Sequence, residues 1–132
     1  MAGLVGKFDA PLLDAVIEAL PVEVSLVDAD DKVRLYNHDG KRIFPRSPSV
    51  IGRNVRDCHP AKSLEKVLAI INGFKSGERT EPAEFWIQLQ GKFVFIRYFP
   101  VRGKDGEYLG TLEVTREISK IKALEGEKRL LD

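Results

Sequence analysis

The chain has 132 residues, of which 43% are hydrophobic and 31% are charged, and its formal net charge is +1. Such a length and composition are typical of one soluble globular domain with a single core. The balanced charge gives no case for nucleic acid or an anionic membrane as a partner, and no apolar run is long enough to span a bilayer. One cysteine excludes an internal disulfide, and we expect a cytoplasmic location.

The first predicted element is a short amphipathic helix between Asp9 and Pro21. Asp9 is a suitable N-cap, Pro11 fits the first turn, and Pro21 ends the run. Apolar residues recur at helical spacing between them: Leu12, Leu13, Val16, Ile17 and Leu20. This stripe must pack on the domain or on a partner.

Two β-rich runs follow at residues 22–27 and 33–36, and the Asp-rich turn between them predicts a hairpin. Asn37, Asp39 and Gly40 end the second run in turn chemistry. Residues 40–60 are locally basic and contain three prolines and two glycines, which predicts turns and single-turn helices.

A longer helix is predicted from Pro60 to Gly77, where Gly77 supplies a C-cap. Its apolar stripe consists of Leu64, Val67, Leu68, Ile71 and Phe74. Three strands follow at residues 83–90, 92–101 and 107–118. The middle one is apolar on both faces, which is typical of a strand in the interior of a sheet.

The last predicted element is a helix over residues 119–132, with Ser119 as its N-cap. Ile121, Leu124 and Leu131 follow coiled-coil spacing. Runs of strands instead of strict β-α-β alternation predict an α+β fold with an antiparallel sheet.

Three passages together resemble a PAS domain, a small sensor and dimerisation module: "EVSLVDADDKVRLYN", "IGRNVRDCHP" and "YLGTLEVTREIS". "RIFPRSPSVIGRNVRDCHPAKS" and "IRYFPVR" further resemble the PAS-like domain found C-terminal to hemerythrin-like segments. The resemblance implies a five-stranded antiparallel sheet with helices on one face. It divides the chain into a flanking helix (1–20), a sensor domain (21–118) and a signalling helix (119–132).

Cys58 and His59 are the residues most suggestive of chemistry. A nucleophile would need an orienting group and an oxyanion site, which adjacent residues do not supply, so we expect no enzyme and no catalytic residues. A zinc site would need four ligands with paired spacing, and we expect no metal ion. Heme needs only one axial ligand, and the resemblance makes His59 or Cys58 a candidate. The alternative is that His59 and Pro60 only cap the helix and fix the turn.

The passage "GRNVR" is similar to the "GRNCR" of blue-light-sensing flavin PAS domains. Val55 occupies the position of their reactive cysteine, so no covalent flavin photochemistry is expected. Arg53, Asn54 and Arg56 could contact an anionic group of a non-covalent flavin. The alternative is a solvated basic turn.

The resemblance also implies a ligand pocket between the sheet and the helices around residues 55–74. The expected lining residues are Phe44, Val55, Cys58, His59, Leu64, Leu68, Phe95, Arg97 and Leu112. The aromatic residues of the last three strands line a pocket, fill a core, or cover a face that pairs with a second subunit. Arg97 is expected to pair across the sheet with Glu113 or to meet a polar ligand.

These observations predict a sensory domain that binds a small ligand and transmits its state through dimer packing and the C-terminal helix. The alternatives are a ligand-free homodimerisation module and a heme- or redox-responsive switch at Cys58 and His59. The expected partners are a second copy of the chain, a small molecule and other domains of a parent protein, with no nucleic acid and no membrane. The ligand itself stays open.

Overall fold

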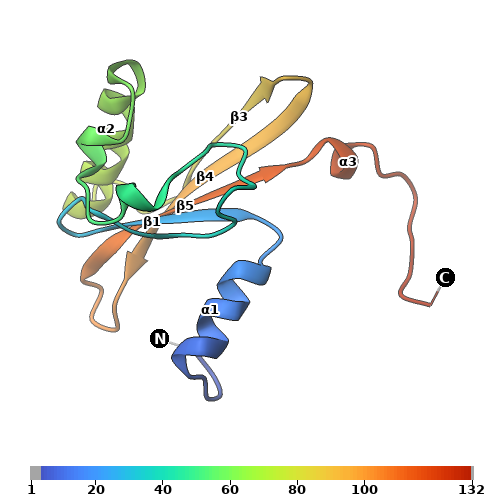
Figure 1. Ribbon diagram of the computed structural model, residues 1–132, viewed down its shortest axis with the longest axis horizontal. Helices are drawn as coiled ribbons and strands as arrows, with labels where there is room; N and C mark the ends of the chain where they lie inside the picture. The colour runs from blue at the N-terminus through green and yellow to red at the C-terminus, as the bar shows by residue number, and fades with distance from the viewer. Residues whose placement is uncertain (1–3, 132) are drawn as a thin grey trace.

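The computed structural model describes residues 4–131 and contains one five-stranded antiparallel sheet in the order β2-β1-β5-β4-β3 (Figure 1). This confirms the predicted α+β fold, and each strand end lies within one residue of its predicted position. The middle strand of the sheet is β5, and the strand with two apolar faces, β4, lies beside it. The strands are β1 (Glu23–Asp28), β2 (Val33–Tyr36), β3 (Ala83–Leu89), β4 (Lys92–Arg102) and β5 (Tyr108–Glu117).

The helices differ widely in length. They are α1 (Ala10–Ala19), α2 (Ala61–Ser76) and α3 (Ser119–Lys122), with two 3₁₀ turns, η1 (Pro48–Val50) and η2 (Val55–Asp57). The Asp9 side chain accepts a hydrogen bond of 2.9 Å from the Leu12 amide, and Gly77 ends α2 with φ 85°. Both predicted caps are confirmed. Helix α2 packs against β4 and β5.

The strand register separates two faces of the sheet. On the inner face, which carries α2, Ile96 lies between Phe85 and Thr115 on the neighbouring strands, and Tyr98 lies opposite Glu113. The outer face carries mostly large apolar side chains: Trp86, Phe93, Phe95, Arg97, Phe99, Leu112 and Val114. Because side chains alternate along a strand, each residue belongs to one face only.

Two apolar clusters hold α2 on the inner face. Phe74 is fully buried against a cluster formed by Ala83, Val94, Ile96 and Tyr98. Val67 and Ile71 pack on Val55 of η2, which is 0% exposed. Burial of each such side chain contributes roughly 1.5–3 kcal/mol to stability.

A buried ion pair fastens the segment after β2 to the sheet. The Arg42 guanidinium lies 3.5 Å from the Glu23 carboxylate, and the two side chains are 1% and 5% exposed. Arg42 donates hydrogen bonds to the carbonyls of Val24, Asn37 and Phe44 and to the Ser25 hydroxyl. Glu23 accepts from the amides of Ile43 and Phe44. Both charges of the Arg42–Glu23 pair are therefore compensated by hydrogen bonds.

Helix α1 is attached through polar contacts near its C-terminal end. The Asn37 side-chain amide donates to the Ile17 carbonyl at 2.8 Å, and the His38 amide donates to the Glu18 carboxylate at 3.0 Å. No residue of α1 is buried, and the helix points away from the sheet (Figure 1). Ile17 and Leu20 of its apolar stripe are half-buried, whereas Leu12, Leu13 and Val16 are exposed.

The predicted helix over residues 119–132 is wrong. Helix α3 ends at Lys122, and the described chain beyond it is irregular, with Gly126 at φ 62°. A 14-residue helix is marginal in water without a packing surface. The N-cap is Ile118 and not Ser119. Asp132, the last residue of the prediction, lies outside the described residues.

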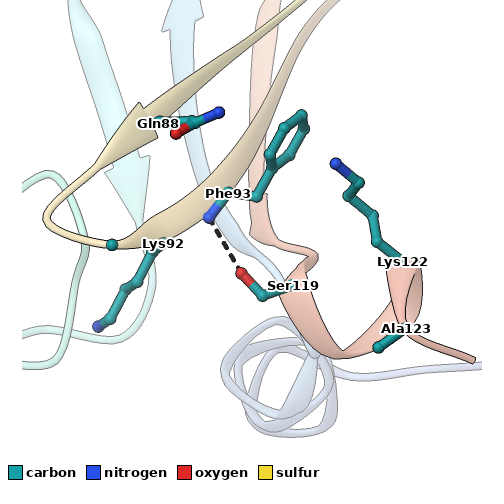
Figure 2. Close-up of a pocket in the computed structure, with 7 residues that line it drawn as sticks. Gln88, Lys92, Phe93, Ser119, Lys122 and Ala123 are labelled. Carbon is teal, nitrogen blue, oxygen red and sulfur yellow. Dashed lines mark hydrogen bonds between the residues drawn. The ribbon is translucent and has the colours of Figure 1, made fainter.

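Ser119 has a different role, which Figure 2 shows. Its hydroxyl accepts a hydrogen bond of 3.0 Å from the Phe93 amide at the start of β4, and the Lys122 ammonium lies 3.6 Å from the centre of the Phe93 ring. These contacts join the end of β5 to the start of β4. Within residues 4–131, no helix has the length and apolar character needed to cross a membrane.

Candidate ligand cavity between the sheet and α2

A cavity of about 660 Å³ lies between the inner face and the N-terminal half of α2, and we call it the α2 cavity. Its apolar wall comes from β3, β4, α2 and the segment after β2. The residues are Phe44, Val67, Ile70, Phe85, Ile87 and Ile96. Alternation along β3 and β4 brings Phe85, Ile87 and Ile96 to the same side as α2.

Polar groups from several parts of the fold also line this cavity. Arg46 comes from the segment after β2, Cys58 and His59 precede α2, and Ser63 and Lys66 belong to its first two turns. The sheet contributes Tyr98 and Glu113, which lie opposite each other on β4 and β5. An apolar chamber with a few converging polar groups is the usual form of a small-molecule site.

Arg46 and Glu113 form an incomplete ion pair. The guanidinium nitrogen and the carboxylate oxygen are 3.9 Å apart, and the side chains are 15% and 12% exposed. Hydrogen bonds of this type have donor–acceptor distances of about 2.7–3.2 Å. Among the described residues, the Arg46 side chain has no hydrogen-bond partner.

Tyr98 lies beside this pair and is neutral at physiological pH. Burial raises the pKa of Tyr98 far above its ordinary value, and the charge of the nearby Glu113 carboxylate and a hydrogen bond to it raise it further. A neutral hydroxyl next to a carboxylate acts as a donor. Glu113 therefore has the Tyr98 hydroxyl as a neighbour, while the donors of Arg46 stay free among the described residues.

Cys58 and His59 are both half-buried on the cavity wall. The Cys58 thiol lies 3.5 Å from the Asn54 carbonyl, and His59 Nδ1 lies 3.2 Å from the Val55 carbonyl. Pro60 occupies the N-cap position of α2, as the structural alternative predicted, but no side chain makes a capping hydrogen bond there. His59 instead fixes the turn through Val55.

A small enclosed void of about 20 Å³ adjoins the α2 cavity. Val55, Ser25 and Thr111 line it, together with residues shared with the larger chamber. A void of this size is large enough for one water molecule. Polar groups of β1 and β5 thus extend inward from the Arg46–Glu113 pair.

Six of the nine predicted lining residues lie on α2 or in the segments that precede it. Phe44, Cys58 and His59 line the α2 cavity, and Val55 lines the small void. Leu68 packs against the cluster around Val55, and Leu64 is half-buried outside the cavity lining. Ligand binding by the residues that line the α2 cavity and the void stays a prediction.

The placement of the other three predicted residues in the pocket is wrong. Phe95, Arg97 and Leu112 lie on the outer face, on the opposite side of the sheet from the α2 cavity. The predicted Arg97–Glu113 pair is wrong for the same reason, since Arg97 lies opposite Val114. The Arg97 guanidinium instead lies 5.2 Å from the ring centres of both Phe95 and Phe99, an arrangement that favours cation–π attraction.

The basic turn expected to meet a flavin is used within the fold. The Asn54 side chain accepts from the Arg56 amide and caps η2, and Arg56 pairs with Asp31 at 3.1 Å. Arg53 is exposed, and none of the three lines the α2 cavity. The alternative of a solvated turn fits their placement better.

Sequence reasoning missed the polar residues Arg46, Ser63 and Lys66, and it considered Tyr98 only among the aromatic residues that could line a pocket. Both faces of β4 are apolar in sequence, so the pattern did not reveal which face meets α2. The usable signal was Glu113 between Leu112 and Val114 on β5. A charged residue in that position marks the face where polar groups are needed.

The donors available for a metal or cofactor are few. Within residues 4–131, no three His, Cys, Asp or Glu side chains are grouped as a metal site. A heme would need one axial nitrogen, and His59 supplies the one imidazole on the described cavity wall. Its Nδ1 lies close to the Val55 carbonyl, so Nε2 is the atom that could bind iron.

Comparisons with known proteins agree with this architecture. A family model described as "PAS domain" matches residues 13–119. A crystal structure of a C-terminal domain from Streptococcus mutans is 32% identical, with 95% of this chain and 96% of that chain covered and a TM-score of 0.86. The PAS domain of BvgS from Bordetella pertussis is 16% identical, with coverage of 83% and 85% and a TM-score of 0.61, and shares the fold.

A curated relative also matches over part of its length. It is described as a probable C4-dicarboxylate sensor kinase of Halalkalibacterium halodurans and is 27% identical over 111 residues. The match covers 84% of this chain but only 19% of the relative. On the strength of the family match and the sheet order, the chain belongs to the PAS domain family, whose members generally have sensory and signalling roles.

Proposed function

We propose that this domain senses a small molecule bound in the α2 cavity and passes its bound state to other domains of a longer protein. The sensor kinase match supports this proposal because the chain corresponds to about a fifth of that relative. The resemblance to PAS-like domains that follow hemerythrin-like segments points the same way. In both kinds of protein, the PAS domain would exchange signals with another domain of the same chain.

The observation that carries the proposal is the open α2 cavity itself. Protein interiors are close-packed and hold few voids larger than a water molecule. Ligand pockets are typically about 300–1,000 Å³, and the 660 Å³ of the α2 cavity falls within that range.

The contacts around β5 provide a route by which ligand state could reach the C-terminal end. Glu113 faces the cavity from β5, and the same strand leads to Ser119, whose hydroxyl holds the Phe93 amide (Figure 2). A ligand that binds one packing of β4 and β5 better than another shifts their equilibrium. The junction at Ser119 would then move with the strands.

Native mass spectrometry of protein measured directly from lysate tests cavity binding. Ile87→Trp places a large ring on the cavity wall, and Gln88→Trp places the same ring on the opposite face as the matched control. We expect a bound small molecule on the wild type and on Gln88→Trp, and none on Ile87→Trp. Spectra showing only the bare chain for all three proteins would refute the proposal.

A second copy of the chain is the partner that we propose for the outer face. Trp86 is 62% exposed there, and Leu12 and Val16 of α1 are 50% and 49% exposed. The charged residues of α1 and of its cap are all acidic, whereas Arg97 and Arg116 with Glu84 leave the outer face of β3, β4 and β5 with a net positive charge. An acidic amphipathic helix and a basic aromatic face are complementary, so α1 of one copy would cover the sheet of the other.

Sedimentation velocity tests this dimer. Val16→Asp places a charge in the apolar stripe of α1, and Ala15→Asp adds the same charge at a neighbouring exposed position as the control. We expect the wild type and Ala15→Asp to sediment as dimers and Val16→Asp as a monomer. A Val16→Asp protein that stays dimeric would show that the stripe is not the interface.

Heme sensing is a second candidate function, favoured by the placement of His59 on the cavity wall. Absorption spectroscopy after addition of hemin distinguishes it. A Soret band that shifts on binding and is lost in His59→Ala would support heme. Unchanged hemin spectra with both proteins would exclude it.

A further inference from the structure

We infer that the α2 cavity takes a zwitterionic ligand with an apolar body, of the class of large apolar α-amino acids. Arg46 would bind the carboxylate, and Glu113 would bind the ammonium group. This inference rests on the proposed function of the cavity and names the chemistry of its ligand.

The free donors of Arg46 are the first observation. A guanidinium has five N–H donors in a planar fork that matches a carboxylate. The Arg46 side chain is only 15% exposed, and no described residue accepts a hydrogen bond from it. Buried charges are normally paired and hydrogen-bonded, so a carboxylate in the cavity would supply the hydrogen-bond acceptor that Arg46 lacks among the described residues.

The second Arg–Glu pair on the same face shows that the fold can compensate such charges fully. Arg42 donates four hydrogen bonds to protein groups, and Glu23 accepts two from backbone amides. That pair lies outside the cavity lining. The Arg46–Glu113 pair, which is not hydrogen-bonded, is the one that faces the cavity. Incomplete pairing is therefore not a general property of this sheet, and it points to a ligand at this position.

The geometry of the pair selects a zwitterion. The closest atoms of Arg46 and Glu113 are 3.9 Å apart, so the two groups are neighbours without being hydrogen-bonded. An α-amino acid presents its carboxylate and ammonium groups side by side on one carbon atom. Such a ligand can meet both side chains at once, whereas a simple acid leaves Glu113 without a cationic partner and a simple amine leaves Arg46 unpaired.

The remaining wall selects a large apolar body. Phe85 and Ile87 of β3, Ile96 of β4 and Ile70 of α2 line the chamber. The Phe85 and Tyr98 rings are stacked with their centres 5.8 Å apart, so an aromatic surface borders the polar end. Apolar side chains gain free energy in proportion to the area buried, which favours aromatic and large aliphatic amino acids over glycine or alanine.

Isothermal titration calorimetry tests this inference with three probes that share one body: L-phenylalanine, 3-phenylpropanoate and phenethylamine. We expect L-phenylalanine to bind most tightly. Arg46→Gln and Glu113→Gln should each weaken its binding by roughly 10- to 100-fold, the usual effect of losing a charge-assisted hydrogen bond. Arg53→Gln, which removes a guanidinium outside the cavity, should leave the affinity unchanged.

Circular dichroism of each variant shows that a loss of binding is not a loss of folding. Equal affinity for the acid and for L-phenylalanine would overturn the role of Glu113, and equal affinity for the amine would overturn that of Arg46. Absence of binding by all three probes, with a ligand still seen by native mass spectrometry, would overturn the amino-acid class and leave the sensor proposal standing. If no probe binds and native mass spectrometry also shows no ligand, the sensor proposal is refuted as well.

Discussion

The inner face of the sheet carries two arginine–glutamate pairs that differ in how completely the protein compensates them. The Arg42–Glu23 pair is nearly inaccessible, and backbone groups satisfy both partners. The Arg46–Glu113 pair is slightly more exposed, its atoms are farther apart, and it faces the α2 cavity. The same two residue types therefore serve a structural purpose at one position and are left available at the other.

The difference follows from what surrounds each pair. Residues 37–44 present carbonyls to Arg42 and backbone amides to Glu23, so this pair fixes the chain that leads from β2 to the cavity. Arg46 lies beyond that wrapped segment and meets open space. The proposed roles in stability and in binding therefore fall to separate pairs.

The largest effect is expected from Arg42→Gln. This change leaves the Glu23 carboxylate buried without its cation, and the free energy of unfolding should fall by about 3–5 kcal/mol. Urea unfolding monitored by circular dichroism measures the loss. A loss below about 1 kcal/mol would mean that the backbone amides alone hold Glu23.

Asn37→Ala should have the next largest effect. The Asn37 side chain accepts from the Val24 amide and donates to the Ile17 and Val22 carbonyls, so its removal leaves buried backbone groups unsatisfied. We expect a loss of about 1–3 kcal/mol in the free energy of unfolding. Asn72→Ala on the exposed side of α2 is the control and should change stability little. Equal losses for both variants would argue against this role.

Alkaline pH should lower the free energy of unfolding through Tyr98, which lies beside the Arg46–Glu113 pair. Burial and the neighbouring Glu113 hold the pKa of folded Tyr98 above its unfolded value, so the folded state favours the neutral phenol. This contribution is fully present below the unfolded pKa of about 10 and is lost as the pH rises above it. Unfolding curves between neutral and strongly alkaline pH should show a decline that is smaller in Tyr98→Phe. Parallel declines in both proteins would contradict this cause.

The smallest effect on stability is expected from Arg46→Gln. Its ion pair is long and lacks hydrogen bonds, so we expect a change of less than about 1 kcal/mol in the free energy of unfolding. The same urea experiment measures it beside Arg42→Gln. A loss as large as that of Arg42→Gln would show that both pairs are structural.

Most of the fold could be predicted from local sequence signals. Asp9, Gly77 and the turn residues between the strands marked element ends, and the period of apolar residues gave the strands and α2. The C-terminal helix could not be predicted correctly, because its spacing fits a coiled coil but the described residues offer it no packing surface. Periodicity shows which residues share a face, and packing decides whether the helix forms.

The candidate site was less accessible to sequence reasoning. Cys58 and His59 drew attention as chemical groups and do line the cavity, but Phe95 and Arg97 were placed on the wrong face. The reason is that β4 is apolar on both sides, so its pattern contains no information about which side meets α2. Only the strand register, which sets Tyr98 opposite Glu113, resolves this ambiguity.

A crystal structure of the purified protein is the decisive test of ligand binding in the α2 cavity, because it shows what lies between Arg46 and the apolar wall. We expect a bound molecule in the α2 cavity with an acceptor atom within hydrogen-bonding distance of the Arg46 guanidinium. A closed chamber, with Arg46 and Glu113 hydrogen-bonded to each other and apolar side chains filling the space, would contradict it.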